Sequence, residues 1–233
     1  MLLEVRELTA GYARLPIVDG VSFAIKDGEA VALLGRNGMG KTTLMRAVFG
    51  LADRYGGEVL VDGEPIPPGR GETLARLGIT FVPDDRGVFP RLSVAENLAL
   101  AGLLGRRRPQ RVEDPLEIFP ELADRRGMLA GHLSGGLQQQ LAIARALAGQ
   151  PRLILIDELS QGIQPSVVDD LARQLTGLSA SLGMALLIVD QVLEVVARIC
   201  TRALIMQKGA ITADVPIATV LAEGAGYRDL LVI

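Results

Sequence analysis

A short run of residues near the N-terminus has the composition and spacing of a loop that binds phosphate groups. It fits the pattern G-x-x-x-x-G-K-[ST], and it stands between an aliphatic run and a helical pattern. Glycines let such a backbone form a concave nest of N–H groups, which faces nucleotide phosphates together with the start of the helix. We expect Lys41 to bridge the outer phosphates and the Thr42 hydroxyl to bind Mg²⁺. The loop comprises Gly35, Arg36, Asn37, Gly38, Met39, Gly40, Lys41, Thr42 and Thr43.

Two adjacent carboxylates, Asp157 and Glu158, end the aliphatic run 153–156. Ligands of open α/β sheets bind at the carboxyl ends of the strands, beside the phosphate loop. This placement predicts that Asp157 holds Mg²⁺ through water and that Glu158 orients or deprotonates the attacking water. A solvated strand end is the alternative interpretation of the pair.

A third group, Ser134, Gly135 and Gly136, precedes a helical pattern over residues 137–148. Serine is a good N-cap, and two glycines leave the N–H groups at the helix start open to an anion. The group therefore predicts a second phosphate-binding helix end, although an ordinary capped helix has the same sequence pattern.

The elements between these groups indicate an α/β fold with a parallel core sheet. Aliphatic runs predict buried strands, and an alternating pattern over 2–8 with a second run at 21–25 predicts antiparallel strands at the N-terminus. We expect a single domain over residues 1–233 that carries a helical insertion at about 93–131, with helices over 95–104 and 115–122. The remaining predicted strands are 30–34, 79–82, 153–156, 186–189 and 204–206, and the remaining helices are 41–51, 137–148 and 167–178.

Composition excludes several classes of protein. One cysteine, Cys200, and one histidine, His132, exclude an internal disulfide and a Cys/His zinc cluster. A net charge of −3 gives no reason to expect a nucleic-acid partner, and we assign no function to the basic run 106–108. No apolar stretch is long enough to span a membrane, and no export signal is visible, so we expect a cytoplasmic protein.

The order and spacing of the three groups resemble the ATP-binding subunits of ABC transporters. The resemblance runs nearly end to end, and it implies a P-loop NTPase core with an N-terminal antiparallel β subdomain and an inserted helical subdomain. It implies that ATP and Mg²⁺ are bound and that ATP is hydrolysed. In that family two subunits dimerise head to tail, so Ser134, Gly135 and Gly136 are expected to contact the γ-phosphate of ATP held by the partner.

Three further positions match family sites. Tyr12 stands where an aromatic side chain stacks on adenine, although a core or surface tyrosine is the simpler interpretation. Asp84 replaces a glutamine that senses Mg²⁺ and relays to the membrane subunits, and it is expected to reach the metal through water. Gln191 replaces a histidine that contacts the γ-phosphate.

Gln191 and the segments 86–93 and 162–165 resemble one subgroup, the second ATPase of branched-chain amino acid and urea importers. The resemblance implies a heterodimer with a companion ATPase, or else a homodimer, on the cytoplasmic face of the inner membrane. Two permease subunits and a periplasmic or extracellular solute-binding protein complete such a system. Phe89 and Pro90 are expected to help form the groove for a permease helix, and an ordinary hydrophobic turn is the alternative interpretation.

Two alternatives remain. A weakly hydrolytic regulatory subunit is compatible with Asp84 and Gln191, whereas Glu158 argues against it. An ABC ATPase of DNA repair or translation is disfavoured, because about fifty residues separate Asp84 from Ser134 and leave no room for long coiled coils.

Overall fold

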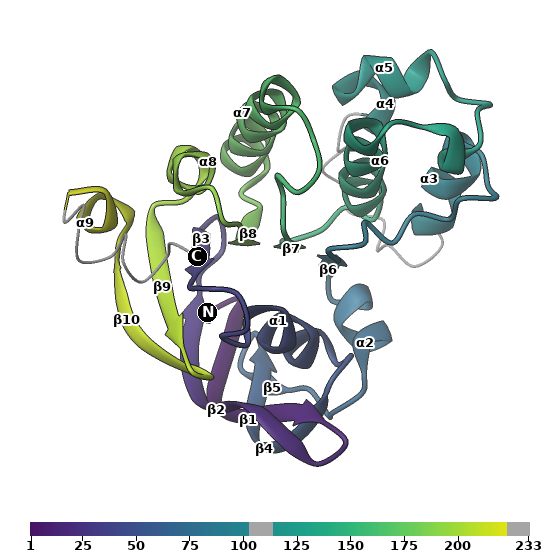
Figure 1. The fold of residues 1–233 in the computed structure, drawn as a ribbon. Coiled ribbons are helices and arrows are strands. Elements are labelled where there is room, and N and C mark those ends of the chain that lie inside the picture. The colour runs from purple at the N-terminus through teal and green to yellow at the C-terminus, as the bar shows by residue number, and fades with distance from the viewer. Residues whose placement is uncertain (103–113, 223–233) are drawn as a thin grey trace.

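The computed structural model describes residues 1–102 and 114–222, and the basic run 106–108 lies outside them. The core is a six-stranded sheet in which the four inner strands β9, β3, β8 and β7 and the edge strand β6 run parallel, while the edge strand β10 is antiparallel to β9 (Figure 1). The predicted parallel α/β core is therefore confirmed. In spatial order the strands are β10 (Ala210–Pro216), β9 (Arg202–Gln207), β3 (Ala30–Leu34), β8 (Ala185–Val189), β7 (Leu153–Asp157) and β6 (Ile79–Val82).

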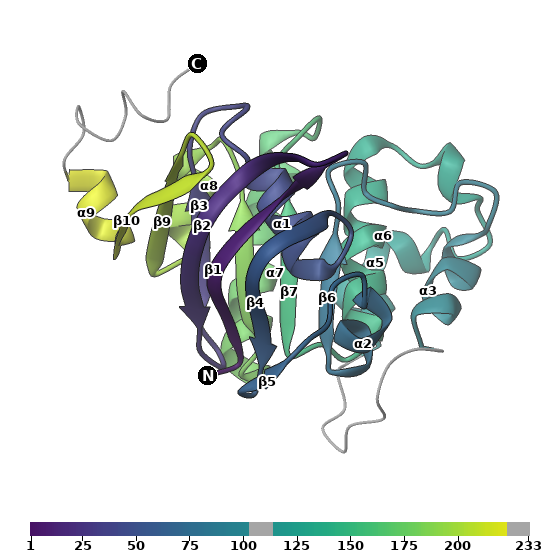
Figure 2. The same cartoon turned by 90° about the horizontal axis from the view of Figure 1, so that it is seen from below.

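A second sheet of four antiparallel strands lies across the core sheet (Figure 2). The antiparallel pairing predicted near the N-terminus is confirmed, and both strands extend beyond the predicted apolar runs, with register shifts along their pairing. The strands in spatial order are β2 (Leu15–Ile25), β1 (Leu3–Tyr12), β4 (Asp53–Val61) and β5 (Glu64–Pro65).

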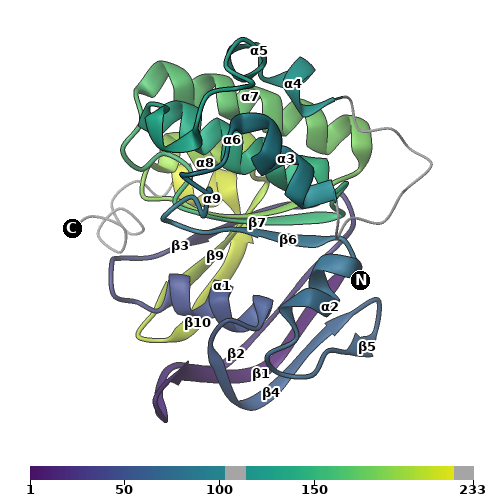
Figure 3. The ribbon, with the colours of Figure 1, turned by 90° about the vertical axis from the view of Figure 1, so that its right-hand side faces the viewer.

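Helices cover both faces of the core sheet (Figure 3). One face packs against α6 (Gly135–Ala148), α7 (Pro165–Leu182) and α8 (Leu193–Ile199), and α9 (Ile217–Ala222) follows the edge strand β10. The other face packs against α1 (Lys41–Phe49), which lies between the two sheets, and α2 (Gly71–Arg76) adjoins β6. Both faces of β3 are therefore buried, with Ala30, Ala32 and Leu34 in one hydrophobic core and Val31 and Leu33 in the other.

The segment between β6 and α6 contains short helices that pack beside α6 (Figure 1). They are α3 (Val94–Gly102), α4 (Pro115–Ile118), α5 (Pro120–Ala123) and a 3₁₀ turn (Ala130–His132). The prediction of one helix over 115–122 was wrong, because Phe119 has φ −119° and ψ 77°. A residue before proline is pushed out of the helical region, and Pro120 therefore divides the segment into two turns.

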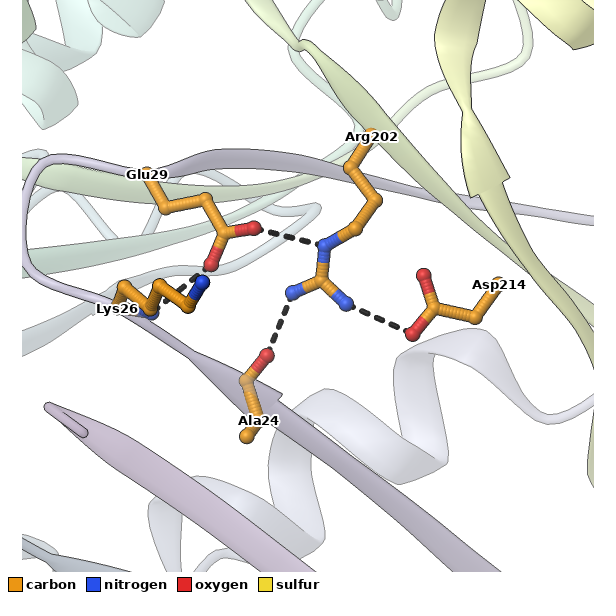
Figure 4. Close-up of polar contacts among 5 residues, drawn as sticks. All are labelled: Ala24, Lys26, Glu29, Arg202 and Asp214. Carbon is orange, nitrogen blue, oxygen red and sulfur yellow. Dashed lines mark hydrogen bonds and ion pairs between the residues drawn. The ribbon is translucent and has the colours of Figure 1, made fainter.

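A polar network joins the antiparallel sheet to one end of the core sheet (Figure 4). Arg202 of β9 contacts Glu29 at 2.7 Å, Asp214 of β10 at 2.8 Å and the carbonyl oxygen of Ala24 in β2. Glu29 also accepts a hydrogen bond from the backbone N–H of Lys26 at 2.8 Å. One guanidinium thus fixes three strands and the turn before β3.

Within residues 1–102 and 114–222, no helix combines the length and the apolar composition needed to cross a lipid bilayer.

Candidate active site

The glycine-rich sequence 35–43 runs from the end of β3 into the first residues of α1, as predicted. Lys41 is the first residue of α1 and is 6% exposed, and its Nζ donates to the carbonyl oxygens of Gly35 at 2.6 Å and Arg36 at 3.0 Å. Burial lowers the pKa of the Lys41 ammonium, and the nearby carboxylates of Glu158 and Asp157 offset part of this shift. The Lys41 ammonium therefore bonds to the backbone at the start of the loop, and it lies near Asp157 and Glu158 at the end of β7.

Two glycines of the loop have different structural roles. Gly35 has φ 151°, and a Cβ atom there would lie 2.3 Å from the carbonyl oxygen of Met206, so the loop packs directly against β9. Gly38 has φ 78°, and a Cβ atom there would meet no described atom within 4 Å, so this part of the loop faces open space. A cavity of about 300 Å³ lies on the open side, where phosphate groups would face the N–H groups of the loop. Its lining is formed by Ile17, Asn37, Gly38, Gly40, Lys41, Thr42, Thr43 and Glu158.

Asp157, the last residue of β7, is fully buried, and neither of its carboxylate oxygens accepts a hydrogen bond from any residue that the structure describes. Burial raises the pKa of Asp157 to about 6, the Thr42 hydroxyl lowers it in part, and the charges of Asp84 and Glu158 raise it further. Thr42 therefore lies close to Asp157, although it makes no hydrogen bond of normal geometry to the carboxylate. A buried carboxyl group of this kind either takes up a proton or is stabilised as a carboxylate by a counter-ion.

The donor set near Asp157 fits Mg²⁺. Among the described residues, no group of three or more His, Cys, Asp or Glu side chains could hold a metal ion by itself. Mg²⁺ is commonly bound by one or two protein oxygens together with nucleotide phosphates and water, so an all-protein cage is not required. The unpartnered oxygens of Asp157 and the hydroxyl of Thr42 are suited to that role.

Glu158 borders the cavity and has a strained backbone, with φ 60°. Its N–H donates to the carbonyl oxygen of Val189 at 2.9 Å, and its Oε1 accepts from Nε2 of Gln191 at 3.1 Å. Oε2 is buried and has no hydrogen-bond partner in the described part of the chain. The structure thus brings Glu158 and Gln191 together at the ends of β7 and β8.

Arg46 of α1, which sequence reasoning missed, lies between two of the predicted site residues. Its Nη2 contacts Oδ1 of Asp84 at 3.0 Å. Burial lowers the pKa of the Arg46 guanidinium, but Tyr12 and Asp84 raise it by more, so both residues lie beside α1. Tyr12 is 37% exposed at the end of β1 and is accessible for stacking, whereas Asp84 is ion-paired.

Ser134 is the N-cap of α6, as predicted, and its hydroxyl accepts from the N–H of Leu137 at 3.4 Å. Gly135 and Gly136 form the first turn of the helix. In Figure 3, α6 lies on one side of the core sheet and α1 on the other, so the two helix starts that the sequence predicts to bind phosphate belong to different layers of the molecule.

Arg86, a second residue that sequence reasoning missed, joins three segments around the start of α6. Its Nη1 donates to Oε1 of Gln138 at 3.0 Å, and its Nη2 donates to the carbonyl oxygen of Gln161 at 3.3 Å. The segment after β6 is thereby fixed to α6 and to the loop after β7.

Comparison with known proteins gives a consistent result. Residues 18–161 match the family model described as ABC transporter. The chain is 34% identical to the high-affinity branched-chain amino acid transport ATP-binding protein BraG of Pseudomonas aeruginosa, over 90% of this chain and 91% of that protein. It is also 34% identical to the lipopolysaccharide export system ATP-binding protein LptB of Escherichia coli, over 91% and 89%. A solved ATP-binding subunit of an ABC transporter superimposes with a TM-score of 0.85 at 27% identity, over 99% of this chain and 98% of that one.

Proposed function

This chain belongs to the ABC transporter family as an ATP-binding subunit, and from that premise we propose that it energises an importer of branched-chain amino acids. It is an ABC ATPase, in which ATP hydrolysis is coupled to transport. One observation carries the proposed chemistry: the buried carboxylate of Asp157 lacks a partner among the described residues, beside Lys41, Thr42 and Glu158. This arrangement suits the binding of a nucleoside triphosphate together with a divalent cation.

Each residue of the site has a role in ATP binding or hydrolysis that follows from its position. The loop N–H groups and Lys41 hold the phosphates, and Thr42 and Asp157 would hold Mg²⁺, which supplies positive charge at the phosphate oxygens. Glu158 accepts a proton from the attacking water, and Gln191 orients its carboxylate through the hydrogen bond to Oε1. Tyr12 stacks on adenine, and Asp84, held by Arg46, would contact Mg²⁺ through water.

The start of α6 serves a second subunit in this proposal. Ser134, Gly135 and Gly136 lie in a different layer from the phosphate loop of the same chain, which supports a shared site. We propose a heterodimer with a companion ATPase, with a homodimer as the alternative. A solute-binding protein outside the membrane would deliver the cargo.

The proposed contact with the two permease subunits lies at Phe89, on the cytoplasmic face of the membrane. Phe89 is 48% exposed, and the guanidinium of Arg145 lies 5.0 Å from the centre of its ring. Nη1 of Arg145 is buried with no hydrogen-bond partner in residues 1–102 and 114–222, next to a cavity of about 120 Å³. An exposed aromatic ring that contacts a guanidinium with one unpaired N–H group supports a docking site for a permease helix with a polar or acidic residue.

Replacement of Glu158 by glutamine tests the hydrolytic role. We expect ATP binding to be retained and turnover to fall by at least about 100-fold, because the amide accepts no proton. Glu194→Gln, at an exposed position on α8, is the control and should hydrolyse ATP like the wild type. Unchanged turnover in Glu158→Gln would remove the assigned role.

Measurements with the companion ATPase and the permeases test the remaining alternatives. Negligible turnover with and without the companion, while ATP is still bound, would favour a regulatory subunit. Reconstituted transport tests the cargo, and stimulation of ATP hydrolysis by a binding protein loaded with branched-chain amino acids supports our proposal. Stimulation only by a urea-binding protein would favour a urea importer, and coupling to lipopolysaccharide would favour export, as in LptB.

A further inference from the structure

Asp190 is a buried carboxylate that joins two loops at the edge of the active site. It follows β8 directly and is 3% exposed. Its Oδ2 accepts from the N–H of Ser160 at 2.7 Å, and its Oδ1 accepts from the Ser160 hydroxyl at 2.7 Å and from the N–H of Val192 at 2.8 Å. Three donors thus compensate a buried charge, and they come from the loop after β7 and from the residue before α8.

The neighbours of Asp190 extend this link to the hydrolytic pair. Val189 accepts a hydrogen bond from the N–H of Glu158, and Gln191 donates one to the Glu158 side chain. The last residue of β8 and the two residues that follow it, 189–191, therefore all form hydrogen bonds with the segment 158–160. The central link, between Asp190 and Ser160, is the one that involves a buried charge.

The link between Asp190 and Ser160 can stabilise the unusual backbone conformation of Glu158. A φ of 60° is unfavourable for a non-glycine residue, and it persists only where the surroundings fix it. Ser160 lies two residues beyond Glu158, and both its N–H and its hydroxyl are held by Asp190. Asparagine could not replace this carboxylate without loss, because its NH₂ group would face a backbone N–H and leave that donor unpaired.

We propose that Asp190 is a positioning residue for ATP hydrolysis. Its hydrogen bonds go to Ser160 and Val192, it does not line the cavity, and it holds the Glu158 backbone and the Gln191 side chain in register across the ends of β7 and β8. The inference rests on the function proposed above, since it acts through Glu158.

The test compares turnover with ATP binding in Asp190→Asn and in Ser160→Ala. We expect kcat of Asp190→Asn to fall by about 100-fold, as for other small displacements of a catalytic group, while KM and the Kd for ATP stay within about twofold. Ser160→Ala removes one of the three hydrogen bonds at a small residue, so it should fold normally and lose about tenfold in kcat. Asp169→Asn, an exposed aspartate on α7 that pairs with Arg198, is the matched control and should behave like the wild type.

A combined variant separates positioning from a general loss of structure. If Asp190 acts through Glu158, single-turnover hydrolysis by Asp190→Asn with Glu158→Gln should be no slower than by Glu158→Gln alone. A further loss in the double variant, or wild-type kcat in both Asp190→Asn and Ser160→Ala, would overturn this inference alone. Wild-type turnover by Glu158→Gln would instead overturn the proposed function.

Discussion

Replacing Asp157 by asparagine should make the protein more stable at neutral pH, although the same change should weaken its use of ATP with Mg²⁺. The carboxylate is fully buried and lacks a hydrogen-bond partner in the part of the chain that the structure describes. Burial raises the pKa of Asp157 from 3.8 to about 6, which means that folding disfavours its ionised form. Asparagine has nearly the same shape and no charge to bury.

The sign and size of the effect follow from the pKa shift. Below pH 3.8 the acid is protonated in the folded and the unfolded chain, so its ionisation does not affect stability. As the pH rises from 3.8 to about 6, the unfolded chain loses the proton first and folding becomes less favourable. Above pH 6 the penalty is complete, and it corresponds to about 3 kcal/mol. The melting temperature of Asp157→Asn should therefore exceed that of the wild type by about 6–12 °C at pH 8.

Urea unfolding at pH 8 and at pH 5, without nucleotide, measures the difference directly. The advantage of the variant should be about half as large at pH 5, since the wild-type acid is mostly protonated in the folded chain at that pH. Asp190→Asn is the contrasting control, because it removes a carboxylate with three hydrogen bonds and should be destabilising at both pH values. If Asp157→Asn were no more stable than the wild type at pH 8, the reasoning about its burial would be refuted.

Two further predictions concern the phosphate loop and the link between the sheets. Lys41→Ala should weaken ATP binding, measured by calorimetry, by about 10-fold to 100-fold, because an ammonium contact with the phosphates is lost. The exposed control Lys26→Ala should bind ATP normally. Equal affinities of the two variants would argue against phosphate binding by this loop. Arg202→Met should lower the free energy of unfolding in urea by about 2 kcal/mol, since Glu29 and Asp214 lose their common partner at a half-buried site; a change below about 0.5 kcal/mol would show that the network is not stabilising.

The parts of the fold that were predictable are those where burial alone determines the residue types. The strand over 30–34 has the predicted bounds, because all five of its residues are aliphatic and buried inside the core sheet. The strand over 79–82 also has the predicted bounds, although it lies at the edge of the sheet and contains Thr80 and Phe81. β4 was missed since its first half contains Gly56 and Gly57 among polar residues, and its exposed half is fixed by pairing with β1 instead. β10 was missed for a related reason, because this edge strand is only partly buried and carries little apolar signal.

In the site, features that depend on neighbouring residues in the sequence were predictable, whereas contacts between distant residues were not. The phosphate loop was predictable because its function depends on residue types at consecutive positions. The contact between Arg86 and Gln138 joins residues 52 positions apart, and that between Asp190 and Ser160 joins residues 30 positions apart, so no local pattern reports them. An acid after an aliphatic strand was the only available signal for Asp190.

Asp157 and Asp190 show why that signal is insufficient by itself. Each is a buried aspartate at the carboxyl end of a strand, and the two strands, β7 and β8, are neighbours in the core sheet. Their roles differ because donors reach Asp190 from Ser160 and Val192, whereas none of the described residues donates to Asp157. A buried charge with its donors satisfied stabilises one arrangement of the chain, while one without them favours a cation that it can bind. The division between positioning and ligand binding is therefore set by loops that approach from elsewhere in the sequence.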